Sequence, residues 1–343
     1  MTDSAYIDVH ALRSDDSLPV QGTTPDMIDL DRVARHLTGA IERGRYRGPT
    51  DVWEYLRRKK CIAMHDGVEC ATLAGLLCFG HDPQAIFPRA VIDIGHYRGT
   101  QTLSYEVTHL EKDIGGTIFD QLARVESYLW DNIHHGMTLS ESSFKRVEVH
   151  EYPRAVIREL GVNMVAHRDY KNFRSAGRVQ LFRNRIEWIS PGGLPPGITV
   201  ENILAEQAPR NPVIMTILYE AGYVEAFGQG LDTVVAVLQQ EGHPPPKFED
   251  TGASFIVTVL GRAMDIFPVD GVYARLSENQ RRLLSIIRTH EALSPRQITE
   301  IIGNRARRSI QRDLRVLVEA DLIQAIGEGR ALRYCLKTEE DGE

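Results

Sequence analysis

Cysteine is scarce in this sequence, and long apolar runs are absent from it. The four cysteines of the 343-residue chain are Cys61, Cys70, Cys78 and Cys335. None of them forms a C-x-x-C pair, and the His134-His135 pair lacks partners at zinc-ligand spacing, so we expect unpaired thiols and no zinc site. No run reaches the roughly 18 apolar residues of a spanning helix, and no basic start leads into an apolar stretch. We therefore expect no membrane span, no secretory signal and a cytoplasmic location.

Charge is distributed unevenly along the chain. Hydrophobic residues make up 42% of the sequence and charged residues 25%, which are ordinary values for a globular protein. The formal net charge is −7, yet residues 276–337 contain 12 Arg and Lys against 7 Asp and Glu, a balance of +5. The remainder then has 28 against 40, a balance of −12. A basic module joined to an acidic body predicts that the C-terminal part meets a polyanion.

Helix and strand signals divide the chain into three blocks. Residues 1–150 are predicted to form an N-terminal α/β region that ends with a long amphipathic helix at 116–133. Residues 151–262 alternate helices with strands, and this order predicts a two-layer α/β sandwich. Its expected helices begin near Pro153 and cover 212–221 and 231–240, and its expected strands are 177–182, 185–189 and 254–260. The third block is 276–337, so the predicted fold class is α/β with a separate C-terminal module.

The helix after Pro153 carries an unusual polar stripe. Glu159 and Asn163 are four residues apart, which places them on one face of a helix, and His167 continues the same line. A carboxylate, an amide and an imidazole along an otherwise apolar helix suggest a binding site. The alternative is a surface stripe with an ordinary i,i+4 hydrogen bond.

Two glycine-containing loops follow this helix. Ser190-Pro-Gly-Gly-Leu194 comes after a predicted strand, and Gly228-Gln-Gly-Leu-Asp-Thr-Val234 opens a predicted helix. Glycine lets backbone N–H groups approach phosphate oxygens, and the helix N-terminus adds partial positive charge. A G-x-G pattern alone is also typical of a turn or cap. The order of polar helix, strand, glycine loop and second glycine loop carries more information than either loop.

That order resembles the GHKL nucleotide-binding superfamily, which includes gyrase, MutL and histidine kinases. Residues 60–262 more closely resemble the RecG-like C-terminal, or Schlafen AlbA-associated, ATP-binding proteins. The matching runs are Thr72-Leu-Ala-Gly-Leu-Leu-Cys-Phe-Gly80, His167-Arg-Asp-Tyr170, Arg185-Ile-Glu-Trp-Ile-Ser-Pro-Gly-Gly193, Arg210-Asn-Pro212 and Val224-Glu-Ala-Phe-Gly-Gln-Gly-Leu231. No G-x-x-x-x-G-K-[ST] loop is present, so the resemblance implies no helicase motor. No early E-x-x-x-x-E-x-K run is present either, so residues 1–150 are expected to be a residual AlbA-associated region.

The resemblance implies a role for each matching residue. Asn163 is the counterpart of a Mg²⁺ ligand, and Glu159 is the counterpart of the catalytic carboxylate that activates water. ATP would be bound by Asn163, His167, Asp169, Ser190, Gly192, Gly193, Gly228, Gln229, Gly230 and Leu231. One departure concerns the adenine: the superfamily places an aspartate ahead of its first glycine box, where this chain has Ser190. Asp169 is a candidate substitute for that missing carboxylate.

Residues 276–337 carry the signals of a small helical module. Ser277 and Ser294 each precede a glutamine by three residues, the capping-box pattern. Arg305, Arg308 and Arg312 follow one another at helical spacing. The module resembles a bacterial winged helix-turn-helix, whose third helix enters the DNA major groove. The expected DNA-contacting residues are Arg305, Arg307, Arg308, Ser309, Gln311, Arg312, Arg315, Arg330 and Arg333. The alternative is a solvated basic face on a protein-binding winged helix.

Together the modules predict an ATP- and Mg²⁺-binding transcriptional regulator that grips double-stranded DNA as a homodimer and contacts no membrane. In this hypothesis, nucleotide binding changes a lid at 194–227. The alternative is a Mg²⁺-dependent ATPase that the basic module targets to DNA, which Glu159 favours because a sensor needs no base. A third hypothesis is a degenerate scaffold that binds no nucleotide.

Overall fold

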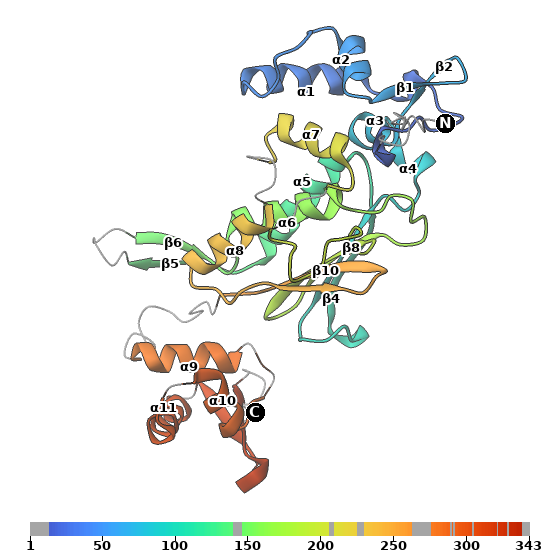
Figure 1. The fold of residues 1–343 in the computed structure, drawn as a ribbon. Helices are drawn as coiled ribbons and strands as arrows, with labels where there is room; N and C mark the ends of the chain where they lie inside the picture. The colour runs from blue at the N-terminus through green and yellow to red at the C-terminus, as the bar shows by residue number, and fades with distance from the viewer. Residues whose placement is uncertain are drawn as a thin grey trace, which may run out of the picture. The chain divides into compact units, whose positions relative to one another are not determined.

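The computed structural model describes residues 14–139, 146–205, 209–224, 230–262, 276–288, 290, 292–303, 305–320, 322–327 and 329–337 (Figure 1). The chain divides into two compact units. The first combines Met1–Asn132 with Pro153–Val259, and the second combines Ile133–Tyr152 with Leu260–Glu343. The boundaries of the three expected domains stay a prediction. Within the described ranges, every helix is too short or too polar to span a membrane.

The N-terminal part of the first unit is a layer of short helices. They are α1 (Leu30–Glu42), α2 (Val52–Arg58), α3 (Leu73–Phe79) and α4 (Pro83–Ile86), with short 3-10 turns at Asp15–Ser17 and Pro25–Met27. The hairpin of β1 (Ile62–His65) and β2 (Val68–Ala71) separates α2 from α3. Each α-helix starts after a polar residue whose side-chain oxygen accepts a backbone N–H three residues on. These caps satisfy donors that the helices themselves leave open.

A mixed six-stranded sheet forms the base of the first unit. Its strands are β3 (Ile92–Tyr97), β4 (Val107–Ile114), β7 (Gly177–Leu181), β8 (Arg185–Pro191), β9 (Lys247–Asp250) and β10 (Ser254–Leu260), and a 3-10 turn at Ser104–Glu106 precedes β4. The strand order is β4-β3-β7-β8-β10-β9. The pairing of β3 with β7 is parallel, whereas β3–β4, β7–β8 and β9–β10 are antiparallel. This mixture of helices and sheet confirms the predicted α/β class.

Helix α6 (Arg154–Ala166) packs against α5 (Ile118–Asn132) and α8 (Gly230–Gln240), and it contacts β8 (Figure 1). Helix α7 (Pro212–Ala221) joins α6 to the N-terminal helices α1 and α3. The apolar stripe predicted at 116–133 faces inward, since Ile118, Val125 and Leu129 are almost fully buried. The core therefore lies between the sheet and the helices that carry the polar stripe.

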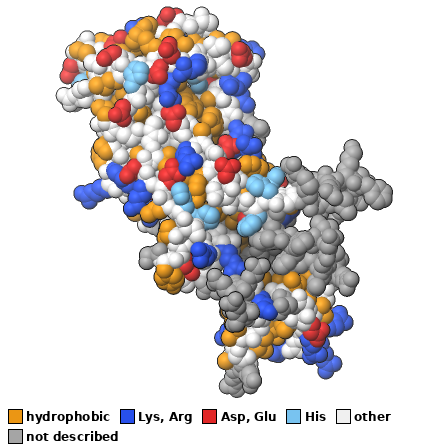
Figure 2. Space-filling view, turned by 180° about the vertical axis from the view of Figure 1, so that it is seen from behind, with side chains coloured by type: hydrophobic (Ala, Val, Ile, Leu, Met, Phe, Trp, Pro, Cys, Tyr) orange, Lys and Arg blue, Asp and Glu red, His pale blue; other side chains and the backbone are white. Residues whose placement is uncertain are grey.

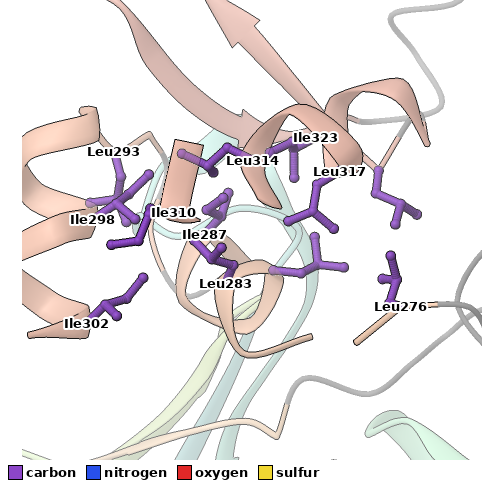
Figure 3. Packing of buried hydrophobic residues seen from close by; sticks show 12 residues of the cluster. Leu276, Leu283, Ile287, Leu293, Ile298, Ile302, Ile310, Leu314, Leu317 and Ile323 are labelled. Atoms are coloured by element: carbon purple, nitrogen blue, oxygen red, sulfur yellow. The ribbon is translucent and has the colours of Figure 1, made fainter. Parts of the chain in front are cut away.

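The second unit contains a hairpin and a small helical module. The hairpin pairs β5 (His135–Leu139) with β6 (Arg146–His150). The module contains α9 (Glu278–Arg288), α10 (Pro295–Ile302), α11 (Arg307–Glu319), a 3-10 turn at Gly329–Ala331 and the hairpin β11 (Ile323–Ile326)–β12 (Arg333–Leu336). The helices share one core, in which Leu283, Ile298 and Leu314 are fully or almost fully buried (Figure 3). The capping box predicted at Ser294 is present.

A buried ionic cluster ties α7 to the N-terminal helices. The Glu220 side chain, at the end of α7, is only 2% exposed and pairs with Lys59. Its Oε2 also accepts a hydrogen bond from the Tyr55 hydroxyl at 2.7 Å and lies 3.4 Å from His36 Nε2. Burial alone would raise the pKa of Glu220, but the bonds from His36, Lys59 and Tyr55 outweigh it and hold that pKa below its ordinary value.

We expect Glu220→Gln to lower the free energy of unfolding by about 3 kcal/mol at pH 7, because it leaves Lys59 without its buried counter-charge. A depressed folded-state pKa contributes stability above the unfolded pKa, and that stability is lost as pH falls through the folded value. The gap between wild type and variant should therefore narrow below the ordinary glutamate pKa of 4.5. Urea unfolding from pH 7 to pH 3 measures it, with Glu42→Gln, at an exposed position at the end of α1, as control. A gap that widens in acid would contradict the assignment.

Candidate functional site

A cavity of about 250 Å³ opens between α6, the loop after β8 and the start of α8. Its wall is largely apolar and includes Met164 on α6, Trp188 on β8, Phe255 and Val257 on β10, and Met215 on α7. The polar groups that line the cavity come from the polar stripe of α6, from the end of β8 with the loop after it, and from the start of α8. An apolar pocket with a few convergent polar groups is the usual form of a small-molecule site.

The polar stripe of α6 is built around one pair. Asn163 Nδ2 donates to Glu159 Oε1 at 3.0 Å and to the Glu159 carbonyl at 2.8 Å, so Glu159 fixes the orientation of the amide. Gly230, the first residue of α8, lies directly against this pair. A Cβ at Gly230 would stand 2.5 Å from Glu159 Oε1 and 3.2 Å from Asn163 Oδ1. Glycine at 230 lets α8 begin this close without displacing the Glu159 carboxylate.

His167 caps the C-terminal end of α6, where its N–H bonds to the Asn163 carbonyl, and its side chain lines the same cavity. Enclosure by protein, together with the nearby Arg210 charge, lowers the pKa of His167 to about 4. The imidazole is therefore neutral at physiological pH and offers one donor and one acceptor. It adds no positive charge to the pocket.

Ser190 and the glycine loop form another part of the wall. The Ser190 hydroxyl donates to the Met164 carbonyl at 2.9 Å, so its oxygen faces the cavity as an acceptor. Gly192 adopts φ of +101°, and a Cβ there would meet the Asp169 Cβ at 2.6 Å. Asp250 holds the next residues, since its carboxylate accepts the N–H of Leu194 at 3.2 Å. The positive φ and the crowding both require glycine at 192.

The predicted ligand-binding residues fall into three groups. The cavity is lined by Glu159, Asn163, His167, Ser190, Gly192, Gly193, Gly230 and Leu231. Asp169 lines a neighbouring open depression on the other side of the glycine loop. Gly228 and Gln229 lie outside the described residues. The structure thus brings together segments about 70 residues apart in the chain.

Two arginines that sequence reasoning left without a role shape this region. Arg168 is 2% exposed, and its guanidinium donates to the carbonyls of Val91, Arg89 and Ser175. It anchors the turn between His167 and Asp169. Arg210 donates to the Gly193 carbonyl and lines the neighbouring depression. Both lie in runs that matched the family, His167-Arg-Asp-Tyr170 and Arg210-Asn-Pro212, so the signal was present although the roles were not.

The charge of the cavity restricts its ligand. Among the described lining residues, none is a lysine or arginine, while Glu159 and Asp232 are acidic. A polyanion entering this cavity therefore needs a cation to offset the carboxylates. Asn163 and Glu159 offer side-chain oxygens, the donors that Mg²⁺ prefers, and Mg²⁺ commonly takes only one or two ligands from protein. The donor set fits such an ion.

The exposed face of α11 carries the predicted basic residues of the second unit. Arg307, Arg308, Gln311, Arg312 and Arg315 are exposed. Figure 2 shows Lys and Arg side chains along the outer edge of this module, at the bottom of the view.

The other predicted DNA-contacting residues are half-buried and bonded within the protein, or their side chains lie outside the described residues. Arg305 Nη2 donates to Asp313 Oδ2 at 2.6 Å and to the half-buried Ser309 hydroxyl at 2.9 Å. Arg333 is half-buried and donates to the Leu332 carbonyl. The side chain of Arg330 lies outside the described residues. Arg305 therefore takes part in an internal ion pair, because Asp313 is buried and needs a counter-charge.

Comparisons with known proteins agree with the fold of the first unit. Residues 175–259 match the family model described as "Putative ATP-dependent DNA helicase recG C-terminal". This stretch runs from just before β7 to the end of β10 and contains Ser190, the glycine loop and α8, but not α6. Among curated proteins, none matches the sequence.

The solved structures similar in fold include a bacterial protein. The crystal structure of the DIP2311 protein from Corynebacterium diphtheriae matches with a TM-score of 0.57 and 20% identity, over 94% of this chain and 64% of that one. At this identity the likeness concerns the fold alone, and the chain spans less than two thirds of the length of that protein. The family match and the pocket together indicate an ATPase-like domain in the first unit.

Proposed function

We propose that this protein is an ATP- and DNA-binding transcriptional regulator, in which the cavity beside α6 senses the nucleotide. The observation that carries the proposal is the contact of Gly230 with the Glu159–Asn163 pair, which places the N-terminus of α8 beside oxygen donors at the mouth of an apolar pocket. Such a helix start favours phosphate, and the apolar wall suits a purine. The exposed arginines of α11 supply the DNA-binding half.

The arrangement supports adenine as the base. Because Ser190 donates its proton to the Met164 carbonyl, its oxygen is left as an acceptor. An acceptor at this position pairs with the amino group of adenine and opposes the keto oxygen of guanine. Ser190 would thus replace the aspartate of the GHKL superfamily without its charge. Asp169, on the far side of the glycine loop, is less well placed for that substitution.

The proposal assigns Mg²⁺ to Asn163 and the phosphates. When bound, Mg²⁺ neutralises phosphate charge, which the carboxylates of Glu159 and Asp232 would otherwise repel. Glu159 orients the Asn163 amide through the 3.0 Å bond, and His167, at the end of the same helix, stays neutral. The chain's own groups thus position the nucleotide and leave charge compensation to the ion.

We expect ATP binding to require Mg²⁺ and adenosine binding to be independent of it. Removing Mg²⁺ with EDTA should weaken ATP by at least about tenfold, the effect of losing one charge-assisted contact. Asn163→Ala should reproduce that loss, whereas Asn132→Ala, on an exposed turn of α5, should not. Titration calorimetry measures both ligands. Equal affinity for ATP with and without Mg²⁺ would count against the site.

A second candidate function, ATP hydrolysis, is favoured by Glu159. A carboxylate beside the phosphate site can orient and deprotonate the attacking water, which a pure sensor does not need. Glu159→Gln keeps an acceptor for Asn163 but removes the base. If the protein is an ATPase, phosphate release should fall about 100-fold or more in Glu159→Gln, with ATP affinity retained. Exposed Glu54→Gln is the control. If phosphate release by the wild type does not exceed background, hydrolysis is excluded and only the sensor function remains proposed.

The DNA-binding proposal treats the second unit's module as a winged helix-turn-helix. Helix α11 would be the recognition helix, and the hairpin β11–β12 would be the wing. The support is the exposed set Arg307, Arg308, Arg312 and Arg315 on a helix whose other face is buried. As a homodimer, the protein would present two such helices to half-sites about one DNA turn apart.

We expect the double variant Arg308→Ala, Arg312→Ala to bind duplex DNA more weakly, because two phosphate- or base-contacting cations are lost. The slope of log K against log salt should decrease by about 2. Fluorescence anisotropy at several salt concentrations measures it, with Arg282→Ala, at an exposed position on α9, as control. A slope equal to that of wild type would remove α11 from the DNA interface.

A further inference from the structure

Helix α7 connects three parts of the cavity wall. Met215 lies on the helix, Pro209 lies three residues before it, and Val224 lies three residues after it, and all three line the cavity. A displacement of α7 would therefore move three parts of the wall at once. What holds α7 in place also sets the shape of the pocket.

The N-terminal part of the first unit holds both ends of α7. At its start, the fully buried Asp16 accepts the N–H groups of Val213 at 2.8 Å and Ile214 at 3.0 Å. This is a helix cap supplied from about 200 residues away. Asn211, whose amide donates to the carbonyls of Ala166 and Arg168, joins the same helix start to the end of α6.

At the other end of α7, Arg45 supplies the contacts. Its Nη1 donates to the Tyr219 carbonyl at 2.9 Å and also to the carbonyl of Val224. The guanidinium lies 4.9 Å from the centre of the Tyr219 ring. A cation at a helix C-terminus complements the helix dipole. Here it also links the last turn of α7 to the residue that re-enters the cavity wall.

We propose that Arg45 is a positioning residue for the cavity: it fixes Val224 against the end of α7 and so holds the wall in its ligand-binding form. Gly222, in the left-handed region with φ of +89°, turns the chain between the two carbonyls that Arg45 binds. Because Arg45 binds a carbonyl on each side of this turn, it fixes the direction in which the chain leaves α7. The proposal rests on the proposed function only for the identity of the ligand.

The first arm of the test uses ATP as the probe. Arg45→Gln should raise the Kd for Mg-ATP about tenfold at a temperature well below its melting point, the equivalent of one charge-assisted bond. Arg45→Lys retains the charge and a donor and should recover most of the affinity. Arg47→Gln, an exposed arginine two residues on, is the matched control. Wild-type affinity in Arg45→Gln, or no recovery in Arg45→Lys, would overturn the proposal.

The second arm needs no ligand. Hydrogen exchange of the ligand-free protein should accelerate in Arg45→Gln at residues 218–224 and stay unchanged in α11. If exchange at 218–224 is unaffected, or if it rises equally across the chain, Arg45 is not a positioning residue. Wild-type protein that binds no ATP would refute the proposed function, and the exchange arm would still decide the role of Arg45.

Discussion

The close approach of α8 to the polar face of α6 is the constraint on which the rest of the site depends. At most helix starts a side chain would project here, and the Glu159 carboxylate would have to move aside to make room for it. Gly230 removes that side chain, and the predicted clash of 2.5 Å shows how little room there is. The consequence is a pocket whose polar end is formed by backbone and two side chains, while its remaining wall stays apolar.

The second feature is the dependence of this pocket on distant chain segments. Asp16, Arg45 and Glu220 connect the N-terminal helices to α7, and each uses a buried or half-buried charge to do so. Buried charges are costly when unpaired, so such contacts define one arrangement sharply. The N-terminal region is therefore part of the structure of the pocket, whatever other role it has.

Much of this architecture was accessible from the sequence. Helix periodicity predicted α5, α6, α7 and α8 within a few residues, and the spacing of Glu159, Asn163 and His167 predicted their shared face. Strands β1, β2, β4, β5, β6 and β9 were not predicted, although the Asp66-Gly67 turn, with both φ values positive, was a hairpin signal. Short strands of mixed polarity such as β4 lack a clear alternation, and their pairing depends on neighbours far away in the chain.

The site was harder to predict where long-range contacts decide a side chain's role. Spacing placed Arg305 on the basic face, but Arg305 forms an ion pair with a buried aspartate eight residues further along the chain. Nothing local distinguishes Arg305 from Arg308, because the difference is the burial of Asp313. Arg45 and Asp16 likewise act on backbone groups more than 170 residues away, which no local pattern records.

The enclosed guanidinium of Arg168 has one more consequence. Two of its three acceptors, the carbonyls of Arg89 and Val91, belong to the segment that enters β3. A fragment that begins at residue 151 would retain every nucleotide motif. It would nevertheless leave the buried guanidinium of Arg168 without two of its acceptors, and its sheet would lack β3 and β4. The smallest piece of the chain that folds autonomously around the pocket must therefore begin well upstream of its recognisable motifs.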